Sequence, residues 1–332
     1  MITQYQSNER VPRPVFGHCG MPGRRILPDY RFHSTYRERA TLKDFEYAAA
    51  TSVDEAVGLL AARGPGAKIL AGGTDIIVQL REGLRAADLV LDVKKIPELT
   101  RLDYEPKRGL RLGAAVPCYR IYEDKIIAAA YPALADSARI IGGWQIQSRA
   151  TIGGNLCNSS PAADSIPSLI VLDATCQIAG PAGRRSVPVA QFCTAPGKNV
   201  LGRGEFLVSL EFPGPAPHCG SRYLRFIPRN EMDIAVVGAA AWVRLNATGD
   251  TIEQSRLALA AVAPMPLAAT DAAVWLSGKP ASQETFAEAG RRARTIAKPI
   301  SDMRGPAEYR VHLVGVLTQR ALAAAVERAR AT

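Results

Sequence analysis

Paired cysteines are missing from this chain of 332 residues. Closely spaced cysteines usually hold iron–sulfur clusters and structural zinc, so we expect neither within this chain. Scattered free thiols are typical of a reducing compartment, and we expect the cytoplasm. The six cysteines, none of them in a CxxC pattern, are Cys19, Cys118, Cys157, Cys176, Cys193 and Cys219.

Long apolar runs and aromatic residues are also scarce. No stretch approaches the roughly 18–20 apolar residues that a helix needs to cross a bilayer, so we expect no membrane span. Aromatic residues make up 6% of the chain, and its 41 basic and 31 acidic residues are scattered. Nucleic-acid-binding proteins cluster basic and aromatic side chains instead. The formal net charge of +10 therefore favours acidic partner subunits or an anionic cofactor over nucleic acid.

Catalytic constellations are absent from the sequence as well. It shows no Ser-His-Asp pattern, no paired carboxylates and no metal-ligand cluster. The tripeptide His18-Cys19-Gly20 recurs as His218-Cys219-Gly220, which raises a metal hypothesis, but no further ligands flank either copy. We therefore expect neither catalytic residues nor a metal site in this chain.

Two glycine-rich segments stand out instead: KILAGGTD at residues 68–75 and RATIGGNLCNSSPAAD at residues 149–164. Glycine pairs can adopt positive φ and let the backbone come close to a ligand. Successive free N–H groups in such turns bind anions, so two turns favour a diphosphate held from both sides. Asp164 would then accept a hydrogen bond from a sugar hydroxyl. The alternative is two ordinary glycine turns in a chain with 28 glycines.

The domain organisation follows from a proline-rich link at Pro213–Pro217. Residues 1–42 show no sustained periodicity and are interpreted as an N-terminal extension. Residues 43–216 are predicted to alternate short strands and helices. The strand, glycine loop and helix near residue 72 suggest a Rossmann unit, but the GxGxxG motif of that fold is missing. Residues 217–332 predict an α+β arrangement of three antiparallel strands and three helices. The predicted strands are 222–227, 234–245 and 252–263, and the helices 267–277, 283–296 and 306–330.

The two glycine segments, extended to KILAGGTDIIVQLREG and QSRATIGGNLCNSSPAADSIPSLIVLDA, resemble the FAD signatures of one flavoprotein family. It is the medium subunit of the xanthine dehydrogenase and carbon monoxide dehydrogenase family of molybdenum hydroxylases. The resemblance runs from about Lys43 to Ala329 and includes LALAAVAPMPLAA at 257–269. It implies a two-subdomain FAD-binding domain of the PCMH or vanillyl-alcohol-oxidase type. A C-terminal domain with a three-stranded antiparallel sheet and three helices would follow.

The resemblance also implies which residues contact FAD. Asp164 matches the position that contacts the flavin nucleotide, and Arg225 stands where many relatives carry a lysine near the isoalloxazine. Ile141 falls beside the ring system, although its segment IGGWQIQSRAT departs from the commoner IASPQIRNxAT. The expected FAD contacts are Ile69, Leu70, Ala71, Gly72, Gly73, Thr74, Asp75, Ile76, Ile141, Thr151, Ile152, Gly153, Gly154, Asn155, Asp164, Leu207 and Arg225.

By the same resemblance, the chain is the electron-transfer subunit of a larger complex, assembled as a dimer of heterotrimers. A large subunit would carry the molybdenum cofactor, and [2Fe-2S] clusters on a small subunit would deliver electrons to FAD here, which passes them to NAD or another acceptor. Covalent FAD attachment in the wider fold commonly uses a histidine. None lies between His33 and His218, so we expect non-covalent FAD, with Cys157 the alternative anchor. Two other interpretations stay open: a self-contained flavin-dependent oxidoreductase with its own substrate pocket, and a scaffold that lost FAD.

Overall fold

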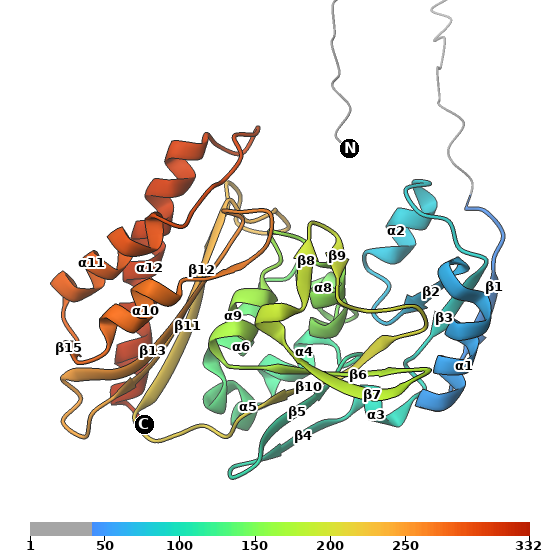
Figure 1. Cartoon of the computed structure of the whole chain (residues 1–332), viewed down its shortest axis with the longest axis horizontal. Helices are drawn as coiled ribbons and strands as arrows, with labels where there is room; N and C mark the ends of the chain where they lie inside the picture. The colour runs from blue at the N-terminus through green and yellow to red at the C-terminus, as the bar shows by residue number, and fades with distance from the viewer. Residues whose placement is uncertain (1–41) are drawn as a thin grey trace, which may run out of the picture. The chain divides into compact units, whose positions relative to one another are not determined.

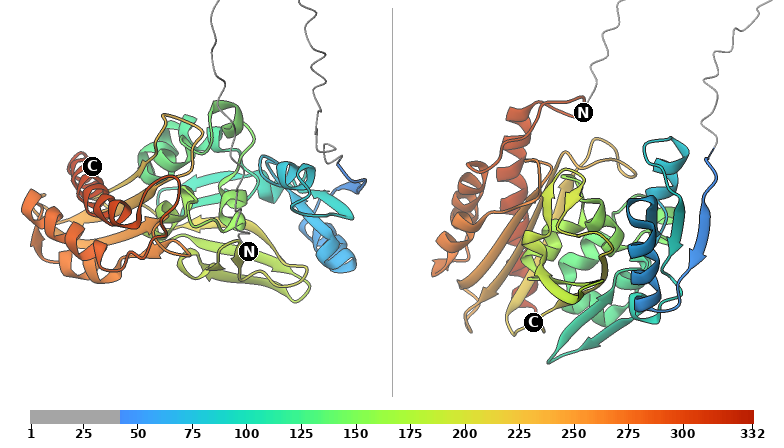
Figure 2. Two further views of the ribbon diagram at one scale, coloured as in Figure 1. Left: turned by 90° about the horizontal axis from the view of Figure 1, so that it is seen from above. Right: turned by 45° about the vertical axis from the view of Figure 1, so that its right-hand side comes forward.

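The computed structural model describes residues 42–332. The predicted N-terminal extension, including His18-Cys19, lies outside the described residues apart from residue 42. Along the chain come a three-stranded sheet, a five-stranded sheet and a C-terminal sheet covered by helices (Figures 1 and 2). None of the helices within residues 42–332 has both the length and the apolar composition to cross a membrane.

The first sheet is parallel, with strand order β1-β3-β2. All four residues of the central strand β3 are buried. Helix α1 begins after Ser52, whose Oγ accepts a hydrogen bond from the Glu55 N–H at 3.1 Å, as a helix N-cap does. The elements are β1 (Glu46–Ala49), α1 (Val53–Arg63), η1 (Gly64–Gly66), β2 (Ala67–Leu70), α2 (Ile76–Arg81) and β3 (Leu89–Asp92).

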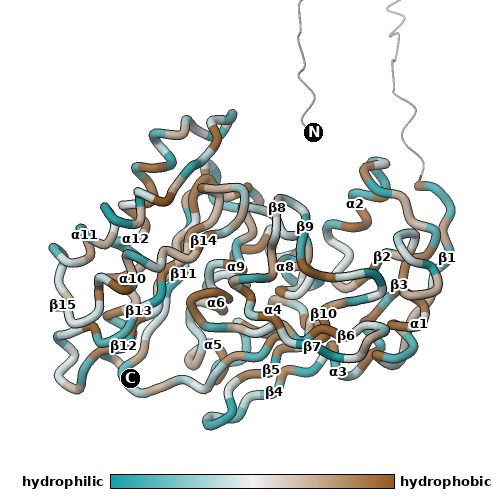
Figure 3. Tube along the Cα trace, in the orientation of Figure 1, coloured by the Kyte–Doolittle hydropathy of each residue, from teal (hydrophilic) through white to brown (hydrophobic). Residues whose placement is uncertain are grey.

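The second sheet is antiparallel, with strand order β4-β5-β10-β6-β7. The turn between β4 and β5 is hydrophilic, whereas the central strand β10 is buried at all but one of its residues (Figure 3). Its elements are α3 (Pro97–Thr100), β4 (Leu102–Glu105), β5 (Gly109–Gly113), β6 (Thr175–Gly180), β7 (Gly183–Pro188), η2 (Val189–Gln191) and β10 (Phe206–Phe212). A separate two-stranded ribbon is formed by β8 (Cys193–Ala195) and β9 (Lys198–Asn199).

Six short helices lie between β5 and β6, and they share a hydrophobic core with the second sheet. Leu134 and Leu169 from these helices and Leu210 from β10 are fully buried in it. Because helices and sheet pack on one another here, the second glycine segment is held on a rigid support. The helices are α4 (Cys118–Glu123), α5 (Lys125–Ala130), α6 (Pro132–Ala138), α7 (Trp144–Gln147), α8 (Ile152–Asn158) and α9 (Ser165–Val171).

The C-terminal sheet contains the three predicted antiparallel strands, followed by the three predicted helices. Ala240 of β12 belongs to the core of the preceding domain, whereas Ala239 and Ala241 belong to the core under the helices. Successive residues of a strand point to opposite faces, so this sheet is buried on both sides. The elements are β11 (Cys219–Phe226), β12 (Val237–Leu245), β13 (Thr251–Ala260), α10 (Thr270–Leu276), α11 (Gln283–Arg294) and α12 (Ala307–Arg330). Two short strands, β14 (Leu267–Ala268) and β15 (Lys279–Pro280), also pair with β13.

An ion cluster around Asp136 of α6 joins the helices of the preceding domain to the C-terminal sheet. The Arg328 guanidinium of α12 donates to both carboxylate oxygens of Asp136, at 2.7 and 3.0 Å. Arg222 of β11 donates to the same carboxylate at 3.2 Å. These contacts fix β11 against α6, next to the segment that leads into the second glycine turn.

Candidate functional site

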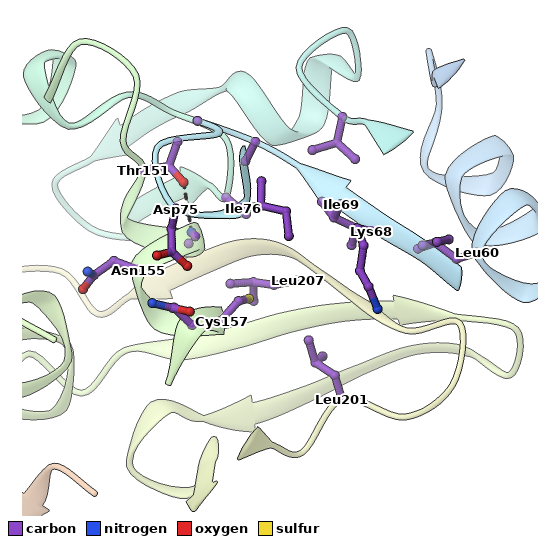
Figure 4. A pocket seen from close by; sticks show the side chains of 18 of the residues that line it. Leu60, Lys68, Ile69, Asp75, Ile76, Thr151, Asn155, Cys157, Leu201 and Leu207 are labelled. Carbon is purple, nitrogen blue, oxygen red and sulfur yellow. Dashed lines mark hydrogen bonds between the residues drawn. The ribbon is translucent and has the colours of Figure 1, made fainter. Parts of the chain in front are cut away.

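A cavity of about 640 Å³ is lined by both glycine segments and by residues of the first and second sheets (Figure 4). This volume is within the usual range of small-molecule and cofactor sites, roughly 300–1,000 Å³. Most of the expected FAD contacts line it: Ile69, Ala71, Gly72, Thr74, Asp75, Ile76, Ile141, Thr151, Gly153, Gly154, Asn155 and Leu207.

The first glycine turn follows β2 and touches the second glycine segment directly. Gly73 has φ of +79°, the left-handed conformation expected for this turn, whereas the same expectation is wrong for Gly72. At Gly72 a Cβ atom would stand 2.1 Å from the carbonyl oxygen of Arg149. Only a residue without a side chain allows this approach, so Gly72 brings the two segments together on one cavity.

The end of β3 holds the first turn in place. Lys94 Nζ donates to the carbonyl oxygen of Ala71 at 3.1 Å and pairs with the Asp92 carboxylate at 2.8 Å. The Tyr47 hydroxyl donates to the same carboxylate at 2.8 Å. Although burial raises it, the pKa of Asp92 is held below its usual range by the Lys94 and Tyr47 hydrogen bonds. Asp92 is therefore ionised near neutral pH and anchors Lys94.

The second glycine segment is a helix start rather than a loop. The expectation of positive φ is wrong for Gly153 and Gly154, which lie in the first turn of α8. Thr151 is the N-cap: its Oγ1 accepts a hydrogen bond from the Gly154 N–H at 2.9 Å. A Cβ on Gly153 would stand 2.5 Å from the carbonyl oxygen of Ala114. Glycine is needed here for close packing against the end of β5.

Two further contacts fix the orientation of this helix start. The Ala150 carbonyl accepts a hydrogen bond from the Cys118 N–H at 2.8 Å, which ties the segment to α4. Asn155 Oδ1 accepts from the Ser165 hydroxyl at 2.6 Å. Since this bond occupies the amide oxygen, the amide nitrogen of Asn155 is the group left to donate into the cavity.

Asp164 and Arg225 pair with each other and do not line the cavity. Asp164 Oδ2 lies 2.6 Å from Arg225 Nη1, and the Tyr223 hydroxyl donates to Asp164 Oδ1 at 2.9 Å. The Asp164 side chain is 11% exposed and the Arg225 side chain 7%. Burial raises the pKa of Asp164 to about 6, against the opposing effect of Arg225 and Tyr223. The pair joins the start of α9 to β11. The other expected contacts outside the lining are Leu70, Gly73 and Ile152.

Several lining residues escaped the sequence reasoning. The most informative are Lys68 at the start of the first segment and Leu201–Glu205, between β9 and β10. The only local signal at the latter is Gly202-Arg203-Gly204, two glycines that flank an arginine just before a strand. Their approach to residues 60–68 is a tertiary contact that no periodicity reveals.

Cys157 lines the cavity, yet its thiol is poorly suited to attack a cofactor. Desolvation and the neighbouring Cys193 raise the pKa of Cys157 to about 12. The thiolate is the nucleophilic form, so the group is unreactive near neutral pH. Among residues 42–332, no cluster of three or more His, Cys, Asp or Glu side chains is arranged to hold a metal ion.

The residues around the cavity fit a dinucleotide such as FAD. Thr74 and Thr151 carry hydroxyls that suit a diphosphate. Lys68, whose Nζ also donates to the Pro65 carbonyl at 2.7 Å, adds a positive charge to the cavity wall. Ile69, Ile141 and Leu207 provide apolar surface for an aromatic ring. Cofactor sites typically have a mostly apolar wall with a small number of convergent polar groups.

Comparison with known proteins agrees with this geometry. The family described as the FAD binding domain in molybdopterin dehydrogenase matches residues 43–215, and the CO dehydrogenase flavoprotein C-terminal domain matches residues 222–325. A putative xanthine dehydrogenase FAD-binding subunit of Escherichia coli (strain K12) is 34% identical over 284 residues, covering 85% of this chain and 96% of that protein. The carbon monoxide dehydrogenase medium chain of Hydrogenophaga pseudoflava is 33% identical, with 86% and 98% covered.

Solved structures show the same fold. A carbon monoxide dehydrogenase from Hydrogenophaga pseudoflava, lacking the Mo-pyranopterin moiety of the molybdenum cofactor, superimposes with a TM-score of 0.82 over 86% of this chain and 98% of that one. Quinoline 2-oxidoreductase from Pseudomonas putida 86 gives 0.80 at 30% identity, over 87% and 99%. This chain belongs to the family of FAD-binding subunits of molybdenum hydroxylases, the oxidoreductases that include xanthine dehydrogenase and carbon monoxide dehydrogenase.

Proposed function

We propose that this chain is the electron-transfer subunit of a multi-subunit molybdenum hydroxylase and holds FAD non-covalently in the cavity between its two glycine segments. The observation that carries the proposal is the approach of Gly72 to the Arg149 carbonyl, which places both segments on one cavity. The high pKa of Cys157 supports non-covalent binding.

The residues of this chain bind and orient the cofactor. When bound, FAD supplies the redox chemistry. Thr74 and Thr151 would donate to its diphosphate, with Lys68 adding positive charge. Ile141 and Leu207 would exclude water from the ring system. Direct contact of FAD with Asp164, Arg225, Leu70, Gly73 and Ile152 stays a prediction.

The names of the relatives and the cysteine pattern support the proposed partners. The relatives are called FAD-binding subunits and medium chains, and the sequence has no CxxC motif. We therefore place the molybdenum cofactor on a large partner and the [2Fe-2S] clusters on a small one. Electrons would pass from these clusters to FAD and then to NAD or another acceptor. A dimer of heterotrimers in the cytoplasm is the proposed assembly.

The domain division belongs to the same proposal. An FAD-binding domain would comprise residues 43–216 and a C-terminal domain residues 217–332, with residues 1–42 as an extension. The proline-rich link at Pro213–Pro217 lies between β10 and β11, where the second sheet ends and the C-terminal sheet begins.

Native purification of the complex tests this proposal. The tagged chain should bring down two further chains, and the complex should contain flavin, molybdenum and iron in addition to the protein. The flavin should be released by denaturation, because it is not covalently attached. A chain that purifies alone and oxidises a substrate by itself would be a self-contained oxidoreductase instead, and a colourless chain that takes up no added FAD would refute the proposal.

A further inference from the structure

The carbonyl oxygen of Ala71, in the first glycine turn, is held by a lysine that does not line the cavity. Lys94 Nζ donates to this oxygen at 3.1 Å from the end of β3. Neither Lys94 nor its partner Asp92 is among the residues that line the cavity. The contact therefore acts on the turn from outside the cavity.

The peptide between Ala71 and Gly72 carries the effect of this contact into the cavity. A planar trans peptide points its C=O and its N–H in opposite directions. Because Lys94 holds the Ala71 carbonyl oxygen, the Gly72 N–H is directed away from Lys94. Gly72 lines the cavity, and no backbone carbonyl within residues 42–332 accepts a hydrogen bond from its N–H. This donor is therefore available to an anion in the cavity.

We infer that Asp92 and Lys94 are positioning residues for the diphosphate of FAD. They fix the Ala71–Gly72 peptide so that its N–H faces the phosphates and its carbonyl oxygen does not. The inference rests on the proposed function, which puts the diphosphate at the two glycine segments. A carbonyl oxygen turned toward a diphosphate would repel it, since both carry negative charge. The orientation of this one peptide thus determines whether it attracts or repels the cofactor.

The three strands of the first sheet supply the parts of this arrangement. Tyr47 belongs to β1, Asp92 ends β3, and Ala71 follows β2. The Asp92 carboxylate accepts from the Tyr47 hydroxyl and from the Lys94 backbone N–H, and it pairs with Lys94 Nζ, each at 2.8 Å. Its side chain is 11% exposed, so little water competes for these contacts. The Lys94 ammonium is consequently held in one place, between the carboxylate and the turn.

The opposite charges of Asp92 and Lys94 separate positioning from simple attraction. If Lys94 only attracted the phosphates, Asp92 would weaken FAD binding, because a carboxylate repels a diphosphate. If Lys94 positions the peptide, Asp92 strengthens FAD binding, because it keeps the ammonium on the Ala71 carbonyl. The two roles predict opposite signs for the change in affinity when the Asp92 charge is removed.

FAD binding by the full-length chain, stripped of its cofactor, tests the inference without any activity assay. Dissociation constants would be measured by fluorescence titration for the wild type, Asp92→Asn, Lys94→Met and Lys94→Arg, each shown to be folded by its circular dichroism spectrum. We expect Asp92→Asn and Lys94→Met to weaken FAD binding about tenfold, or 1.4 kcal/mol, the order of one hydrogen bond to a charged group. Lys94→Arg should recover most of the affinity, since a guanidinium can still donate to the Ala71 carbonyl.

Lys95→Met is the matched control, because Lys95 is the exposed neighbour of Lys94 and does not line the cavity. This variant loses the same charge one residue away and should bind FAD as the wild type does. Raising the salt from about 0.1 to about 1 M shortens the Debye length from about 10 to about 3 Å. The affinity ratio between wild type and Lys94→Met should stay constant over this range, because the contact acts through a peptide and not as a distant charge.

Riboflavin separates positioning from damage to the cavity, since it carries the flavin without phosphates. It should bind Asp92→Asn, Lys94→Met and the wild type alike, whereas a distorted cavity would bind it more weakly. Tighter FAD binding by Asp92→Asn, unchanged FAD binding by Lys94→Met, or equal losses for FAD and riboflavin would overturn the inference and leave the proposed function standing. A wild-type chain that binds no FAD would overturn both.

Discussion

Replacing Asp164 by alanine removes one partner of a buried ion pair between α9 and β11. The Arg225 guanidinium, 7% exposed, would lose a carboxylate at 2.6 Å, and the buried Tyr223 hydroxyl would lose its acceptor at 2.9 Å. Among residues 42–332, the backbone oxygen of Asp233, at 3.5 Å, is the acceptor that would stay hydrogen-bonded to Arg225. Leaving such a charge buried and unpaired costs about 3–5 kcal/mol in free energy of unfolding.

Thermal unfolding of the FAD-free chain measures this cost, since ligand binding then contributes nothing. At about 2 °C per kcal/mol for a unit of this size, Tm should fall by about 6–10 °C. Asp164→Asn should lose less, because its amide oxygen still accepts from Tyr223. The double variant Asp164→Ala/Arg225→Met should be more stable than the sum of the single losses predicts, because no unpaired charge remains.

A loss of less than about 1 °C for Asp164→Ala, or strictly additive losses in the double variant, would refute this reasoning. Flavin affinity of the folded Asp164→Asn chain addresses the separate prediction that Asp164 contacts FAD. Weaker FAD binding by this variant would support the contact. Unchanged binding would restrict the role of Asp164 to joining α9 and β11.

Three further changes test the cavity walls. Gly72→Ala should push the two glycine segments apart and abolish FAD retention, because its Cβ would stand 2.1 Å from the Arg149 carbonyl oxygen. Gly58→Ala is the control, since Gly58 of α1 has open space around it, and this variant should keep FAD. The flavin content of the purified variants measures both outcomes. Thr151→Ala should cost about 1 kcal/mol in unfolding free energy and Thr151→Ser much less, since serine also caps helices; equal urea midpoints would contradict the capping role. Hydrogen bonding to Arg185 lowers the pKa of Glu205 in the folded chain. The stability advantage of the wild type over Glu205→Gln should therefore be full above about pH 4.3, the usual glutamate pKa, and be lost as the pH falls through the lowered value. A difference in acid unfolding that does not depend on pH would argue against the ion pair between Arg185 and Glu205.

The elements with strong periodicity were predictable from the sequence. The three long C-terminal strands and the three helices after them were anticipated, because alternating and helical apolar patterns persist over many residues there. The two-residue strands β14 and β15 are too short to carry a pattern, and helix 267–277 was consequently placed three residues too early at its start. Boundaries are set by pairing with β13, which the sequence does not display.

The site was predictable where a residue acts through its own backbone and not where it acts through a distant partner. Gly72 was identified as part of a turn, but its contact with the Arg149 carbonyl, 77 positions later, comes from the fold alone. At Thr151 the cap preference competes with two glycines, which disfavour helices, so the sequence predicts a loop where the structure has the start of α8.

The longest-range contacts were the least accessible to sequence reasoning. Asp164 and Arg225 stand 61 positions apart, and both were expected to face the cofactor; nothing local shows that they pair. The ion pair between Arg185 and Glu205 is not visible in the sequence for the same reason, nor is the approach of residues 201–205 to the cavity. Ion pairs between separate strands are decided by packing, whereas turns and caps are decided within a few residues.

The location of FAD in a structure of the FAD-loaded chain is the most direct test of the account. We predict density for the diphosphate between Gly72–Thr74 and Thr151–Gly154, in the cavity that these segments share. Density for FAD at any other place on the chain, or an unliganded cavity in a preparation that contains stoichiometric flavin, would contradict it.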